Sequence, residues 1–177
     1  RKAMNRLSIV LRHAAALGLD VDLQATEKAK ALLGKTRHLP KNIPAMAWAD
    51  VPEFYASLEE PTLTHLALRL LILNPGVRSK PLRHLRLEQI DGDVWTVPEG
   101  DMKGQKGKAP AYRVPLCQEA KRIIELARPH SRNGYLFPNT LGGVISDMTM
   151  SRMMERRGLE ARPHGFRTSL RTWLAET

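Results

Sequence analysis

The chain has 177 residues, of which 42% are hydrophobic and 26% are charged, a composition typical of a globular protein rather than a disordered one. Its net charge of +10 and its pI near 10.2 favour a polyanionic partner, with nucleic acid ranked first. A basic surface that only keeps the protein soluble is the alternative. Residues 1–45 are proportionally the more basic, with nine Lys or Arg against three Asp or Glu.

The cysteine and apolar content of the chain indicate the cellular environment in which it works. The single cysteine, Cys117, excludes an intrachain disulfide and a cysteine-rich metal site, so a reducing, cytoplasmic environment is expected. Purely apolar runs such as Leu70–Leu73 are only a few residues long, far too short to span a membrane, and the sequence shows no secretory signal. The histidines lack the spacing of metal ligands, so no metal site is expected.

The first 45 residues predict a helix and a linker. Apolar residues from Ala3 to Leu17 follow helical spacing, and Gly18 is placed to end that helix. The polar stretch 20–44 predicts a short helix and a basic linker. A domain boundary is therefore expected near residue 45.

The next segment predicts two helices and a turn. Asp50 is expected to cap a helix that has Pro52 in its first turn, and Thr62 to cap a strongly apolar helix that continues to Leu73. The sequence Asn74-Pro75-Gly76 must end this second helix. Arg78 therefore lies just after this turn, next to the end of the helix.

After one more short helix, the sequence pattern changes from helical to strand-like. Ser79 can cap that helix, with Leu82 and Leu85 facing inward and Arg83 and Arg86 facing outward. Two strands are then predicted, Val94–Val97 and Ala111–Val114, around a flexible tip at 104–108. Lys103 sits at the entrance to that tip.

Helical patterns return in the last third of the chain. Helices are predicted for Cys117–Arg128 and for Ser146–Arg157, the latter capped by Ser146 and ended by Gly158. The last helix should start near His164. Its buried residues are expected to be Phe166, Leu170 and either Trp173 or Leu174.

Four cationic residues together suit chemistry at a phosphodiester. Planar guanidinium groups at Arg78 and Arg167 match the non-bridging oxygens two hydrogen bonds at a time. Lys103 could protonate the leaving 5′ oxygen, and His164 could move a proton near neutral pH. Taken singly, each has an ordinary reading as a surface residue or a helix cap, and Lys106 rivals Lys103.

The neighbourhood of His164 makes the pattern specific. The run Arg162-Pro163-His164-Gly165-Phe166-Arg167-Thr168, followed by Leu170–Glu176, resembles the corresponding helix of the tyrosine recombinases, the phage-integrase family of phages and other mobile genetic elements. The resemblance implies a mainly α fold with a small antiparallel β-sheet. It also implies that residues 1–45 are the last helix of a core-binding domain plus a basic linker, and that 46–177 form a catalytic domain.

The resemblance also implies roles and partners. Arg78 and Arg167 would hold the scissile phosphate, Lys103 would be the general acid, and His164 would assist proton transfer, with no cofactor and no small-molecule substrate. The expected partner is double-stranded DNA at attachment sites in the bacterial nucleoid, bound by a homotetramer of the parent protein, and no membrane partner is expected. Further DNA contacts are expected from the basic residues near these positions: Lys80, Arg83, Lys106, Lys108 and Arg162.

Two departures from the family pattern leave an alternative open. An acidic residue commonly follows the first arginine by three positions, but Pro81 stands there. The nucleophilic tyrosine is expected beyond Thr177, so the chain is expected to bind DNA without cutting it. The alternative is a non-catalytic DNA-binding relic or regulator derived from an integrase; a basic RNA-binding protein is disfavoured because no RNA-binding motif is present.

Overall fold

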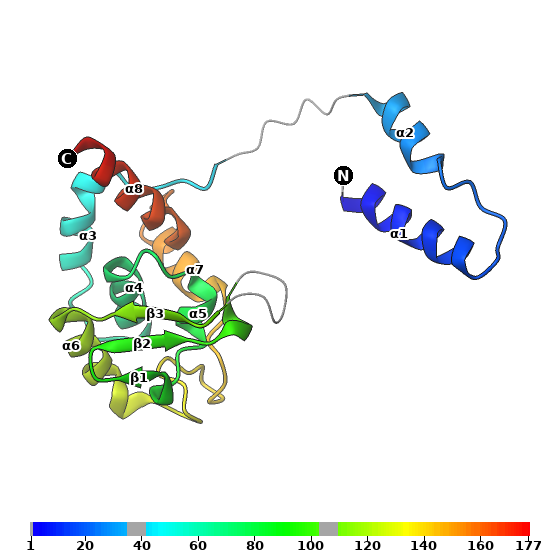
Figure 1. The fold of residues 1–177 in the computed structure, drawn as a ribbon. Helices are drawn as coiled ribbons and strands as arrows, with labels where there is room; N and C mark the ends of the chain where they lie inside the picture. Colours follow the sequence, from blue (N-terminus) through cyan, green and yellow to red (C-terminus); the bar gives the residue numbers. More distant parts are fainter. Residues whose placement is uncertain (1, 35–41, 103–109) are drawn as a thin grey trace. The chain divides into compact units, whose positions relative to one another are not determined.

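The computed structural model describes residues 2–34, 42–102 and 110–177 (Figure 1). The chain divides into two compact units, Arg1–Lys41 and Asn42–Thr177. Within the described ranges, no helix combines the length and the apolar character needed to cross a membrane.

The first unit holds two helices, α1 (Lys2–Ala16) and α2 (Ala25–Leu33). Gly18 follows α1 with a φ of 79°, a conformation that favours glycine and ends the helix as predicted. Asp22 accepts the backbone N–H of Gln24 and the ammonium of Lys28, both at 2.8 Å, which fixes the start of α2. The apolar side of α1 stays exposed at Leu7, Ile9, Val10 and Leu17.

The second unit is mainly helical and carries one small antiparallel sheet, which confirms the predicted fold class. Its α-helices are α3 (Val51–Ala56), α4 (Leu63–Leu73), α5 (Ser79–Arg83), α6 (Gln118–Ala127), α7 (Met148–Arg156) and α8 (Phe166–Glu176). Its strands are β1 (Ile90–Asp91), β2 (Val94–Val97) and β3 (Tyr112–Pro115). Short 3-10 turns are η1 (Trp48–Asp50), η2 (Leu87–Gln89), η3 (Glu99–Asp101), η4 (Arg128–His130) and η5 (Pro163–Gly165).

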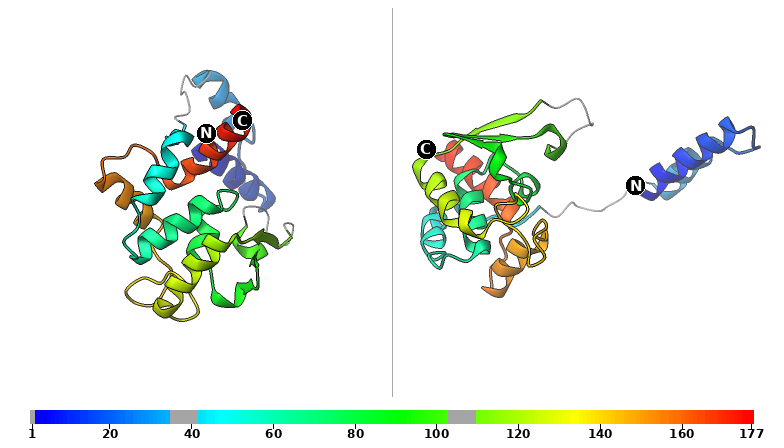
Figure 2. Two further views of the ribbon diagram at one scale, coloured as in Figure 1. Left: turned by 90° about the vertical axis from the view of Figure 1, so that its left-hand side faces the viewer. Right: turned by 90° about the horizontal axis from the view of Figure 1, so that it is seen from below.

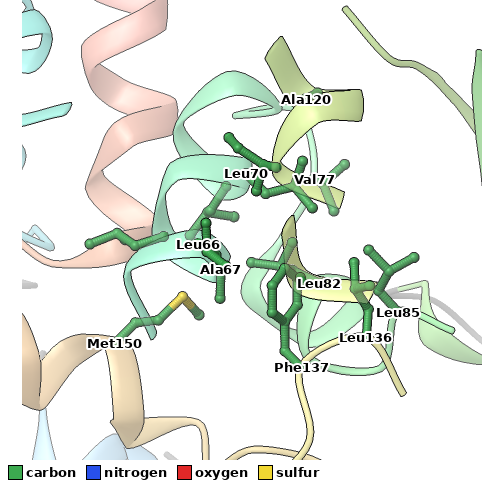
Figure 3. Packing of buried hydrophobic residues seen from close by; sticks show 14 of the residues in the cluster. Leu66, Ala67, Leu70, Val77, Leu82, Leu85, Ala120, Leu136, Phe137 and Met150 are labelled. Atoms are coloured by element: carbon green, nitrogen blue, oxygen red, sulfur yellow. The ribbon is translucent and has the colours of Figure 1, made fainter. Parts of the chain in front are cut away.

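Helix α4 forms the centre of the core. Thr62 caps it as predicted, because its hydroxyl accepts the N–H of His65 at 3.3 Å. Nearly every residue of α4 from His65 to Leu71 is buried, so this helix is covered on all sides. Figure 3 shows apolar side chains from α4, α5, α6 and α7 converging on one cluster, which includes Leu66, Leu82, Leu85, Ala120, Phe137 and Met150.

The sheet runs in the order β1-β2-β3 with antiparallel neighbours. Trp95 of β2 pairs with Val114 of β3, and both side chains are buried against the helices. The indole N–H of Trp95 donates to Gln89 at 3.2 Å, which satisfies its one polar group. In both views of Figure 2 the strands lie at the edge of the helical body. This arrangement leaves the end of β2 and the start of β3 beside α5.

Three local predictions were wrong. Arg78, and not Ser79, takes the N-cap position of α5. Asp147, and not Ser146, takes the N-cap position of α7. Asp50 does take the predicted N-cap position of α3, although its side chain makes no capping hydrogen bond. On α8, Phe166 is buried as predicted, but Trp173 is 43% exposed and Leu174 is 64% exposed.

A charged network ties three helices together. Glu119 on α6 accepts hydrogen bonds from Arg69 of α4 at 2.8 Å, from Tyr55 of α3 at 2.9 Å and from Arg122 at 2.7 Å. The guanidinium of Arg69 also lies over the ring of Tyr55, 4.6 Å from its centroid. The hydrogen bond from Arg122, followed by that from Tyr55, lowers the pKa of Glu119 from 4.5 to about 2 against the opposing effect of burial.

This network predicts acid-sensitive stability. Because the pKa of Glu119 is lowered in the folded state, its contribution is fully present above about pH 4.5 and is lost as the pH falls through about 2. Glu119→Gln should lower the melting temperature at pH 7 by about 5 °C, since buried Arg69 loses its carboxylate, and this difference should shrink at pH 2. Glu125→Gln on the same helix is the control, because Glu125 pairs only with exposed Arg128. An equal effect of the two substitutions would contradict this account.

Candidate active site

The turn between α4 and α5 presents Arg78. Asn74 is buried, donates through its side chain to the carbonyl of Leu70 at 2.9 Å, and accepts the N–H of Val77 at 2.9 Å. These two bonds close the turn that Asn74-Pro75-Gly76 was predicted to form. Arg78 follows with an extended backbone and an exposed side chain. Among the described residues, its guanidinium makes no hydrogen bond or ion pair.

His164 and Arg167 stand at the start of α8. Pro163 opens turn η5, which runs directly into the helix, and both Pro163 and Gly165 are buried. The buried proline and glycine hold the turn against the body, while His164 and Arg167 remain exposed. The Nη1 of Arg167 donates to the carbonyl oxygen of Gly76 at 2.9 Å. This hydrogen bond joins the two segments that carry the predicted arginines.

Two hollows meet at Gly76. The larger, of about 460 Å³, is lined by His164, Arg167, Thr168 and Arg171 of the α8 region together with Pro75 and Gly76. The smaller, of about 20 Å³, is lined by Gly76, Arg78, Pro81, Asp101 and Tyr112 among others. Gly76 thus separates the Arg167 side of the site from the Arg78 side.

The hydroxyl of Tyr112 lies against Gly76. A Cβ added to Gly76 would approach that hydroxyl to 3.3 Å, which is tighter than most real contacts. The sequence alone did not indicate a role for Tyr112, because its position beside Arg78 depends on the pairing of β2 with β3. The antiparallel register Val97↔Tyr112 supplies this placement, and only the alternation of the strand gave a hint of it.

An acidic side chain lines the hollow that contains Pro81. Asp101 is mostly buried and pairs with Lys80 of α5 at 3.3 Å, and its Oδ1 lies 3.8 Å from Nδ1 of His84. Lys80 also donates to the carbonyl of Gly100 at 2.8 Å. These contacts fasten α5 to turn η3, immediately before the segment that contains Lys103.

The other predicted DNA contacts are partly engaged with the protein itself. Arg83 donates to the carbonyl of Ile145 at 2.9 Å. The Nη1 of Arg162 donates to three consecutive backbone carbonyls, those of Leu159, Glu160 and Ala161. A DNA-binding role for these side chains therefore stays a prediction. Lys103, Lys106 and Lys108 lie outside the described residues.

The described geometry suits an oxyanion. Two exposed guanidinium groups, those of Arg78 and Arg167, come from segments joined by a hydrogen bond at Gly76, and His164 lines the same hollow as Arg167. Such a pair can bind a phosphate through several charge-assisted hydrogen bonds. Over the described ranges, no three His, Cys, Asp or Glu side chains cluster in a way that could hold a metal ion.

Comparison with known proteins identifies the family. Residues 45–177 match the phage integrase family. The chain is also 32% identical over 155 residues to y4rF of Sinorhizobium fredii (strain NBRC 101917 / NGR234), a protein described as an integrase/recombinase. The chain belongs to the phage integrase family. The match spans 77% of this chain but 35% of y4rF.

Solved structures share the integrase fold. The chain is similar to a lambda integrase (75–356) dimer bound to a COC′ core site, with a TM-score of 0.64 and 17% identity over 94% of this chain and 62% of that one. It is similar to the Tn1549 transposon integrase in complex with circular intermediate DNA, with a TM-score of 0.63, 14% identity, and 99% and 65% coverage. For XerA recombinase the TM-score is 0.57 and the identity 18%, with 93% and 58% coverage. This chain therefore spans about a third of its curated relative and about three fifths of these integrase and recombinase chains.

The bond between Arg167 and Gly76 predicts local protection of the turn. In Arg167→Ala, the amide hydrogen of Val77 should exchange about five times faster, because the turn loses one hydrogen bond to the helix. Amides in α4 should be unaffected. Arg171→Ala is the matched control, since Arg171 lines the same hollow and its side chain makes no hydrogen bond to another described residue. Unchanged exchange at Val77 in the Arg167 variant would contradict the proposed link.

Proposed function

We propose that this chain is the catalytic part of a site-specific DNA recombinase that cleaves and rejoins DNA through a 3′-phosphotyrosine intermediate. The observation that carries the proposal is the hydrogen bond from Arg167 to the carbonyl of Gly76, because it joins the helix that carries Arg167 to the turn that precedes Arg78. Membership of the phage integrase family supports it. The named partners of two similar structures, a lambda core site and circular intermediate DNA, make double-stranded DNA the proposed substrate.

Each side chain has a proposed task. Arg78 and Arg167 hold the non-bridging oxygens of the scissile phosphate and stabilise the charge that grows there in the transition state. His164 holds or returns a proton beside the phosphate. Lys103 gives a proton to the departing 5′ oxygen. Tyr112 is added to this set as a hydroxyl donor toward the phosphate, on the basis of its place against Gly76 and beside Arg78.

The proposed reaction conserves the phosphodiester. A tyrosine hydroxyl passes its proton to His164 as its oxygen attacks phosphorus and forms the new P–O bond, while the bond to the 5′ oxygen breaks and that oxygen takes up a proton from Lys103. A 5′ hydroxyl of a partner strand then attacks the phosphotyrosine and releases the tyrosine. Because the covalent link preserves the bond energy, rejoining requires no nucleoside triphosphate.

The nucleophile is proposed to lie beyond Thr177. The hydroxyl of Tyr55 donates a hydrogen bond to Glu119. The guanidinium carbon of Arg86 lies 4.8 Å from the centroid of the Tyr135 ring. Neither tyrosine lines either hollow at Gly76. The 177-residue chain alone is therefore proposed to bind DNA without cutting it, and a tetramer of the longer protein on two duplexes is the proposed recombining assembly.

The non-catalytic relic remains the competing function. The observation in favour of this relic is that Pro81 stands three positions after Arg78, where the family commonly has an acidic residue. Asp101 lines the same hollow as Arg78, held there by Lys80. An acidic group is thus present near Arg78 despite Pro81, which weakens the case for a degenerate site.

Covalent trapping tests the proposal. The full-length protein containing this chain is incubated with a nicked duplex whose short 5′-hydroxyl fragment diffuses away after cleavage, and the adduct is resolved on denaturing gels and mapped by peptide mass spectrometry. The wild type should form an adduct at a tyrosine downstream of Thr177. Arg167→Ala should slow adduct formation about 100- to 1000-fold, because one transition-state donor is lost, while the folded structure persists.

The control and the contradicting outcomes are specific. Arg128→Ala, an exposed residue paired with Glu125 on α6, should leave the adduct rate unchanged. DNA binding without an adduct in the wild type would favour the relic, and full activity of Arg167→Ala would refute the site assignment. An adduct at Tyr112 would place the nucleophile inside this chain and overturn that part of the proposal.

A further inference from the structure

The segment that precedes α3 lies along α8. This segment, residues 44–48, is here called the strap, and in Figure 1 it leads past α8 into α3. The carbonyl of Pro44 accepts the backbone N–H of Arg162 at 3.1 Å. The carbonyl of Met46 accepts the hydroxyl of Ser169 at 2.6 Å, and the indole of Trp48 donates to Glu176 at 2.6 Å. The strap is thus fastened at three points from turn η5 to the end of α8.

Gly165 lies directly under the strap. A Cβ at this position would come within 2.5 Å of the carbonyl oxygen of Pro44 and within 2.8 Å of the Cα of Ala45. Both are backbone atoms, so neither can rotate aside as a flexible side chain would. The backbone of Gly165 is ordinary, with φ −64° and ψ −24°. Glycine is therefore required here by the proximity of the strap and not by its conformation.

The strap and the phosphate-facing side chains occupy opposite faces of α8. At about 100° per residue, Gly165, Ser169 and Glu176 lie within roughly 40° of one another around the helix. Arg167 and Arg171 lie roughly 200° to 240° from Gly165, on the side of the larger hollow. A displacement of α8 on the side that contacts the strap therefore displaces Arg167 and Arg171 as well, because all of these residues belong to one helix.

The strap contributes little to the core. Pro44 and Ala45 are exposed, and Met46 is half-buried against the core. Besides Met46, the strap is held by its hydrogen bonds and by the close backbone contact at Gly165. Such contacts fix a position more than they add stability.

We propose that the strap sets the position of the His164–Arg167 turn against the scissile phosphate, with Gly165 and Ser169 as its positioning residues. This inference rests on the proposed function. Neither residue touches the phosphate; each acts through α8.

Substitutions at both residues test the role in the full-length protein. Ser169→Ala removes the hydroxyl donor and should lower single-turnover cleavage of the nicked duplex about 10-fold. Gly165→Ala should lower it about 100-fold, because the added Cβ forces the strap and the helix apart. DNA affinity should change less than about threefold, since the misplacement acts on the transition state. Ser169→Thr, which keeps the hydroxyl, should restore cleavage to near the wild-type rate.

The Gly165 variant separates positioning from folding. Alanine suits a helical backbone better than glycine, so without the strap Gly165→Ala would be neutral or stabilising. Ser151→Ala on α7 is the matched control for loss of a helical hydroxyl, because the hydroxyl of Ser151 makes no hydrogen bond to another described residue. Cleavage at the wild-type rate in both variants, or DNA affinity that falls in parallel with cleavage, would overturn the inference.

A second measurement is independent of activity. In the 177-residue chain, Ser169→Ala and Gly165→Ala should shift the NMR signals of the His164 imidazole and the Arg167 Nε, while Ser151→Ala should not. Unmoved signals would refute the strap even if the enzyme cleaves DNA. Absence of any adduct in the wild type would instead count against the proposed function and leave this spectroscopic result to decide the strap.

Discussion

The hydrogen bond from Arg167 to the carbonyl of Gly76 is the contact on which the site depends. It joins residues that are 91 positions apart, and it connects the turn that presents Arg78 to the helix that presents His164 and Arg167. Gly76 can serve this purpose because it lacks a side chain where the hydroxyl of Tyr112 approaches. A single backbone carbonyl thereby sets the arrangement of three polar side chains from separate elements.

Three sides of helix α8 make different contacts. One face carries Arg167 and Arg171 beside the larger hollow, and the opposite face receives the strap at Gly165 and Ser169. Between them, Phe166 enters the core and stacks on Phe54 of α3, with ring centroids 5.9 Å apart. The helix is therefore held by one aromatic anchor and by hydrogen bonds on its back, which leaves its cationic face open to a ligand.

Much of the fold could be predicted from local signals. Thr62, Gly18 and Gly158 ended or started helices where predicted, because capping and positive φ depend on neighbouring residues. The exposure of Trp173 could not be predicted. Its helical spacing marks an apolar face, but spacing does not say how far the body extends beneath that face, and here it supports α8 mainly at Phe166.

The sequence predicted the main candidate residues of the site, but not the contacts that hold them in place. Arg78, His164 and Arg167 stood out because their neighbourhoods resemble a known family, yet Arg78 as an N-cap follows from the closure of the turn by Asn74. Tyr112 and Asp101 required the pairing of β2 with β3 and the contact of α5 with turn η3. No sequence signal marked Ser169, because the partner of its hydroxyl is a backbone carbonyl 123 residues away.

The most direct test is a crystal structure of the chain bound to a duplex that contains the scissile phosphate. The account predicts that Arg78 and Arg167 both donate hydrogen bonds to the same phosphate, with the Arg167–Gly76 contact retained and the imidazole of His164 beside it. A phosphate held by only one of the two arginines, or seated away from the hollows at Gly76, would contradict the account.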